Sequence, residues 1–212
     1  MKKLLMAAAA VVALASAGAA SADTINFGQF GGEFTSLPNT ITTGLTTGGV
    51  GFTVTGPGSG FTILKQGNSW AGNFPTGTLL LFNSYAPGPM TFDFVTAISS
   101  ITQLAIESNY YGNYIATLKA YDSSLTLLGT QNLNAVSAFA PGTVPAFNFS
   151  APGISRLVIS TTNDGVGFAL GGAGGTGGYN SVPEPATWGL MIMGFGALGA
   201  MMRRRNATLA TA

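Results

Sequence analysis

Between Asp23 and Asn180 the sequence shows no sustained helical period, and this constrains the fold more than any other feature. It consists instead of short runs rich in β-branched and aromatic residues, each bounded by Gly, Pro, Asn, Asp or Ser. The runs are GVGFTVTG, FTILKQ, TLLLFNS, MTFDFVTAI, YIATLKAYD, LTLLGTQ, AFNFS and RLVISTT. Many short strands separated by turns predict an all-β fold, either an antiparallel β-sandwich or a barrel. Glycine, at 31 of 212 residues, suits a fold with many turns.

The run YIATLKAYD has the alternating pattern expected of a strand with two different faces. Alternate residues share a face of a strand, and here the two sets are Tyr114, Ala116, Leu118 and Ala120 against Ile115, Thr117, Lys119 and Tyr121. This alternation predicts a strand with one buried face. Asp122, Ser123 and Ser124 follow it, and their side chains favour a turn, so the segment predicts a β-hairpin.

The first 22 residues predict a secretory signal peptide. Two lysines precede an apolar run, and Ala20 and Ala22 form the small-residue pattern of a cleavage site. We expect a signal helix that is removed after Ala22. The mature protein would then begin at Asp23, outside the cytoplasm.

Charge and composition exclude several functional classes. Cysteine and histidine are absent, which removes Ser-His-Asp and Cys-His catalysis and thiolate or imidazole metal sites. The chain has eight basic and seven acidic residues. Between residues 4 and 202, three basic residues stand against all seven acids, a net charge of 3 − 7 = −4, so the body has no clustered basic surface for nucleic acid. We predict no cofactor, no metal site and no nucleic-acid partner.

Residues 23–170 resemble a jelly-roll domain common in exported bacterial proteins. The resemblance rests on a Phe-x-Phe strand in MTFDFVTAI, a Tyr-Asp turn in YIATLKAYD and a late Val-Ile-Ser strand in RLVISTT. It implies a β-sandwich similar in layout to galactose-binding-like and carbohydrate-binding modules. Those domains often close with an Asp after a Phe-Ala strand, whereas this sequence has Gly171 and Gly172 there.

The segment 171–182 is rich in glycine and predicts a flexible linker. It contains one Gly-x-Gly-x-x-Gly pattern, and Gly194, Gly196 and Gly199 form another. A dinucleotide site needs this pattern between a strand and a helix of a βαβ unit, and neither copy has that context. We interpret both as chance matches.

Residues 186–202 predict a single transmembrane helix. This run of 17 uncharged residues would span about 25 Å as a helix, near the short limit for a hydrocarbon core of ~30 Å. Trp188 occupies an interfacial position, and Arg203, Arg204 and Arg205 form a cytoplasmic stop. The topology places the body outside and residues 206–212 in the cytoplasm.

The segment 183–205 resembles the PEP-CTERM sorting tail of Gram-negative bacteria. It has Pro183, Glu184 and Pro185, then Trp188, a Gly-rich apolar span and the arginine cluster, in that order. The resemblance implies recognition by an exosortase-type membrane processing enzyme. The protein would be anchored transiently in the inner membrane and then reach the cell surface or the extracellular space. The alternative is an ordinary membrane-anchored structural protein with a coincidental Pro-Glu-Pro.

For the body we predict a non-catalytic surface or matrix protein with a candidate exopolysaccharide site in ESNYYGNY. Exposed aromatic rings beside polar groups can stack on sugars, and the site residues would be Tyr110, Tyr111, Tyr114 and Glu107. The alternative for the rings is packing within the sandwich. The alternative function is a secreted glycosidase, for which Asp93 and Glu107 are the interior carboxylate pair to consider.

Overall fold

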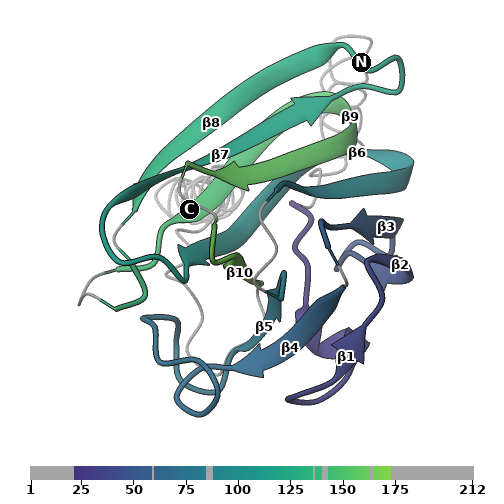
Figure 1. The fold of residues 1–212 in the computed structure, drawn as a ribbon. Helices are drawn as coiled ribbons and strands as arrows, with labels where there is room; N and C mark the ends of the chain where they lie inside the picture. The colour runs from purple at the N-terminus through teal and green to yellow at the C-terminus, as the bar shows by residue number, and fades with distance from the viewer. Residues whose placement is uncertain are drawn as a thin grey trace, which may run out of the picture. The chain divides into compact units, whose positions relative to one another are not determined.

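The computed structural model describes residues 22–58, 60–84, 88–135, 137–139, 143–162 and 165–172, which form an antiparallel β-sandwich (Figure 1). This confirms the predicted fold class of the body. The predicted signal helix, the linker beyond Gly172 and the C-terminal span lie outside the described residues. Within the ranges given above, no helix has the length and apolar character needed to cross a bilayer.

The described residues contain a short 3-10 helix, η1 (Phe27–Phe30), and ten strands. In chain order the strands are β1 (Ser36–Leu37), β2 (Thr40–Leu45), β3 (Gly51–Thr55), β4 (Phe61–Lys65), β5 (Leu79–Phe82), β6 (Met90–Ser108), β7 (Tyr114–Tyr121), β8 (Leu127–Ala135), β9 (Ala146–Thr161) and β10 (Phe168–Gly171).

Two long strands, β6 and β9, link the two layers of the sandwich. Their pairing shifts register between Asp93 and Ile98 and twice more before Leu104, and such irregularities let a strand bend. In one layer, the first part of β6 pairs with β3 and with the second part of β9. The same part of β9 pairs with β7, and β7 pairs with β8 at the edge; we call this layer the β7 layer. In the other layer, the second part of β6 pairs with the first part of β9 and with β10. From β10 the layer continues through β5 and β4 to β1; we call it the β10 layer.

The main hydrophobic core lies between the layers. Phe52 and Phe92 come from the β7 layer, and Phe61, Phe147 and Phe168 come from the β10 layer; all are at most 1% exposed. The alternation predicted one buried face for β7, and the structure assigns that face to Tyr114, Ala116, Leu118 and Ala120, with exposed or half-buried residues between them. The predicted turn between β7 and β8 is present. In it, Asp122 Oδ1 accepts hydrogen bonds from the backbone N–H groups of Ser124 and Thr126.

A second core covers the outer face of the β10 layer. It consists of Trp70, Phe74, Leu80, Phe82, Ala105, Ala138, Val144 and Ala169. Trp70 and Phe74 come from the β4–β5 loop (residues 66–78), and Ala138 and Val144 from the segment between β8 and β9. Because loops cover them, β5 and β10 are buried on both faces, which accounts for their uninterrupted apolar sequences LLLF and FALG.

Asp23, the residue predicted to follow the signal peptide, is part of the fold. Its side chain is 7% exposed, and Oδ1 accepts hydrogen bonds from Thr46 Oγ1 at 2.6 Å and from the N–H of Gly48 at 3.0 Å. Its backbone carbonyl accepts from the N–H of Thr102 on β6. A Cβ atom at Gly48 would overlap the Asp23 carboxylate, so this contact requires glycine.

Candidate functional site

Glu107 lies on β6, under the β4–β5 loop on the outer face of the β10 layer. It is 1% exposed, and its carboxylate accepts hydrogen bonds from Trp70 Nε1 at 2.8 Å and from the Asn73 backbone N–H and Nδ2 at 3.0 and 2.7 Å. A buried carboxylate requires such donors, because it has lost its water. Glu107 therefore holds the loop against the sheet.

Two further contacts fix the same loop. A Cβ atom at Gly72 would overlap the Glu107 carboxylate, so glycine allows this close approach. At the other end, Glu33 accepts hydrogen bonds from Asn68 Nδ2 at 2.7 Å and from the N–H of Ser69 at 3.1 Å. Hydrogen bonding from Ser69, followed by that from Asn68, lowers the pKa of Glu33 below its ordinary value. The loop is thus a fixed part of the structure.

A pocket of about 310 Å³ opens beside this loop. It is lined by Leu64, Ser69, Trp70, Ala71, Gly72, Asn109, Ala138 and Phe139. The Phe139 ring stacks on that of Tyr111, with centroids 4.1 Å apart and planes at 14°. Tyr111 is 74% exposed and Phe139 is 47% exposed. A solvent-exposed aromatic pair therefore lies beside a pocket lined by both polar and apolar residues. We name this region, the pocket with Tyr111, the aromatic site.

The structure separates the four residues predicted for glycan binding. Tyr110 and Tyr111 are exposed, at 40% and 74%, whereas Glu107 and Tyr114 are interior. Tyr114 OH donates a hydrogen bond to the Ile106 carbonyl at 3.1 Å, and burial, with a smaller contribution from the charge of Glu107, raises the pKa of its phenol far above the usual value. Phe139 and the 69–72 segment were not predicted; the only sequence signal is a tryptophan within a Gly- and Asn-rich loop.

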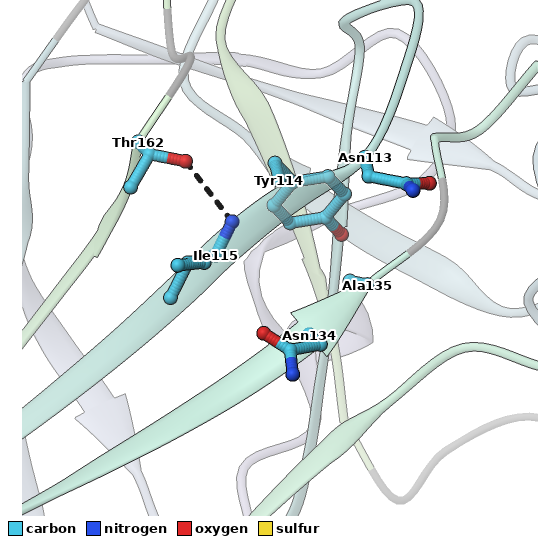
Figure 2. A pocket seen from close by; sticks show the side chains of 6 residues that line it. All are labelled: Asn113, Tyr114, Ile115, Asn134, Ala135 and Thr162. Carbon is cyan, nitrogen blue, oxygen red and sulfur yellow. Dashed lines mark hydrogen bonds between the residues drawn. The ribbon is translucent and has the colours of Figure 1, made fainter.

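A second, larger pocket of about 560 Å³ lies where β7 begins and β8 ends, at the rim of the β7 layer. Figure 2 shows its lining: Asn113, Tyr114, Ile115, Asn134, Ala135 and Thr162. Thr162 Oγ1 accepts a hydrogen bond from the Ile115 N–H at 3.0 Å. None of these six residues is charged, and the phenol of Tyr114 is already engaged, so the lining offers no acid–base pair for catalysis.

The carboxylate pair considered for a glycosidase does not share a cleft. Asp93 lies on the outer face of the β7 layer, where Oδ1 accepts a hydrogen bond from Arg156 Nε. Glu107 lies on the outer face of the β10 layer, and the main core separates the two. Glycosidase carboxyl groups lie about 5 to 10 Å apart. Among the described residues, no group of three or more acidic side chains could hold a metal ion.

Comparisons with known proteins identify the C-terminal segment. Residues 181–205 match the PEP-CTERM protein-sorting motif. This motif includes the Pro-Glu-Pro, Trp188 and arginine positions predicted above, and it marks an exported protein that is held transiently at the membrane, processed there by exosortase and sorted to the cell surface. No functionally curated protein matches the chain.

One solved structure, the crystal structure of a DUF4465 family protein from Bacteroides caccae ATCC 43185, is similar to this chain. The two chains are 11% identical, with a TM-score of 0.44, and the alignment covers 70% of this chain and 95% of that chain.

Proposed function

We propose that this is a non-catalytic surface or matrix protein whose β-sandwich binds exopolysaccharide at the aromatic site. The observation that carries the proposal is the exposed stack of Tyr111 on Phe139 beside the pocket. Large aromatic rings are usually buried when nothing binds them, because burying a ring removes apolar surface from water. An exposed pair next to a hollow offers a flat surface for the apolar face of a sugar.

The surroundings of the rings support the same interpretation. Asn109 lines the pocket and can hydrogen-bond to hydroxyl groups, and Trp70 provides an apolar wall. Glu107 and Glu33 fix the loop that carries Ser69 and Trp70, so little conformational entropy would be lost on binding. In this proposal Glu107 positions the site and does not touch the ligand.

Delivery of the domain follows from the tail. In the proposed division, residues 1–22 are removed after Ala22, the sandwich predicted as 23–170 extends to Gly171, the last residue of β10, the rest of 171–182 forms a linker, and 183–205 form the sorting tail. Residues 186–202 hold the protein in the inner membrane, with 206–212 on the cytoplasmic side. Pro183 and Pro185 disfavour helix and would keep the recognition element extended outside the span.

The binding proposal is tested with Tyr111→Ala and Phe139→Ala, and with Tyr121→Ala as a matched control on the β7 layer. We expect each of the first two variants to retain about tenfold less host exopolysaccharide, roughly 1.4 kcal/mol, with unchanged thermal unfolding. Tyr121→Ala should bind like the wild type. Unchanged binding in both aromatic-site variants would assign the rings to packing alone.

The sorting proposal is tested by replacing Pro183, Glu184 and Pro185 with alanine. Export and insertion should be unchanged, because the signal peptide and the span are intact, but the full-length protein should accumulate in the inner membrane. Mass spectrometry of the C-terminus compares wild type and variant. If the chain is instead a simple membrane-anchored structural protein, the C-terminus should be intact in both the wild type and the variant. Neutral residues at Arg203, Arg204 and Arg205 test the span separately, because their loss should release unprocessed protein.

A further inference from the structure

β8 is an edge strand. Within the described residues it pairs with β7 along one side, from Leu127 to Ala135, and no described strand pairs with its other side. Figure 1 shows it at the rim of the β7 layer. Thr130, Asn132 and Asn134 alternate along its exposed face. The free side of such a strand presents N–H and C=O groups that can pair with another chain.

The other edges of the sandwich are protected against such pairing. β1 has two residues, and β2 is interrupted by a register shift between Ile41 and Gly44. At the free side of β9, the N–H of Asn148 is capped by Gln131 Oε1 at 3.1 Å, and Pro152 lacks an N–H. β8 has nine residues, and its register with β7 is regular from Gly129 to Ala135. Short strands, bulges and prolines are the devices by which proteins blunt edges, and β8 has none along this stretch.

Charge, the remaining protective device, is also missing. No Asp, Glu, Lys or Arg occurs between Asp122 and Arg156, a stretch that contains all of β8. Leu125, in the turn before the strand, and Leu127, its first residue, are 58% and 51% exposed. Two copies of an uncharged strand do not repel each other, whereas like charges placed opposite one another destabilise a strand pair.

We propose that β8 pairs with β8 of a second copy of this chain, antiparallel and related by a two-fold axis. A two-fold axis brings the same surface of both copies together. A ladder centred on Gln131, the middle residue of strand 127–135, keeps its central pairs within the regular stretch that begins at Gly129. In that register Thr130 faces Asn132 of the second copy, and these side chains can hydrogen-bond. The β7 layers of two molecules would form one continuous sheet.

The absence of cysteine makes the test direct. Thr130→Cys together with Asn132→Cys places each thiol opposite its partner across the axis, within the distance that a disulfide spans. The matched control is Thr40→Cys with Thr42→Cys, two exposed positions on the other edge of the same layer. The full-length proteins are exported in cells and oxidised, and covalent dimers are then measured on non-reducing gels.

We expect most of the β8 variant, and little of the β2 variant, to form dimers. Equal cross-linking of the two variants, or none in a β8 variant that is exported and folded, would overturn the proposal. Light scattering on wild-type protein purified from cells gives a second measurement that needs no cysteine. It should report two chains, and one chain in Asn132→Lys, because the ladder would then contain two like charges. A wild-type mass of one chain across the concentration range would also refute β8 pairing.

Discussion

The outer faces of the two layers are built differently, although both belong to one antiparallel sandwich. On the β7 layer the outer face is open: Lys119 and Asn132 are exposed, Thr117 donates a hydrogen bond to Asn132, and Asp93 pairs with Arg156. On the β10 layer the β4–β5 loop and the segment after β8 cover the sheet and bury a carboxylate. A flat polar face needs only an alternating sequence, whereas a covered face needs loops fixed in place. The aromatic site is formed by residues of these two covering segments together with Leu64, Asn109 and Tyr111.

Glu107→Ala should give the largest effect and would break the covered face. The change removes the carboxylate that accepts hydrogen bonds from the Trp70 Nε1–H and the Asn73 N–H under the loop. Each buried donor without a partner costs about 1–3 kcal/mol, so we expect a loss of roughly 3 kcal/mol or more in the free energy of unfolding. Urea denaturation measures it. A loss below about 1 kcal/mol, typical of an exposed carboxylate, would show that the loop is not held as described.

Trp70→Phe sharpens the same comparison with a smaller change. The ring is largely kept and can still pack on Phe82, but the hydrogen bond to Glu107 is lost. Hydrogen bonds to charged groups contribute about 1.5–3 kcal/mol, and we expect a decrease of about 2 kcal/mol in denaturant unfolding. Tyr121→Phe, on the open face, is the control and should change stability by less than about 0.5 kcal/mol.

Tyr114→Phe tests a bond that joins the layers, from β7 to the Ile106 carbonyl on β6. At neutral pH the loss should be about 1 kcal/mol. The folded pKa of Tyr114 is raised, mainly by burial, so its contribution is complete below the unfolded pKa of about 10 and is lost as the pH rises above it. Above pH 10, the midpoint temperature of thermal unfolding should therefore fall more steeply with pH for the wild type than for the variant. Parallel curves would contradict this assignment.

Asp93→Ala, on the open face, should have the smallest effect. The Asp93 and Arg156 side chains are 41% and 36% exposed, and such ion pairs contribute about 0–1 kcal/mol because water screens them. We expect a change below about 1 kcal/mol in urea denaturation. A loss equal to that of Glu107→Ala would remove the energetic difference between the faces.

The sequence predicts the open face better than the covered one, for a physical reason. The alternation in YIATLKAYD predicts that β7 has one buried face, because one face meets water and the other meets the core. The apolar run of β5 identifies a strand but not what buries its second face. The stack of Tyr111 on Phe139 joins residues 28 apart in sequence, and local pattern contains no information about such a contact. The short polar stretch of ESNYYGNY likewise did not show that Glu107 and Tyr114 are interior.

Hydrogen–deuterium exchange with and without host exopolysaccharide tests most directly whether function resides on the covered face. The exported protein is compared peptide by peptide, so that any self-association through β8 is present in both samples. We predict added protection in peptides covering 66–73, 108–112 and 137–139, and none in β7 or β8. Protection confined to β7 and β8, or no protection at saturating polysaccharide, would contradict the account.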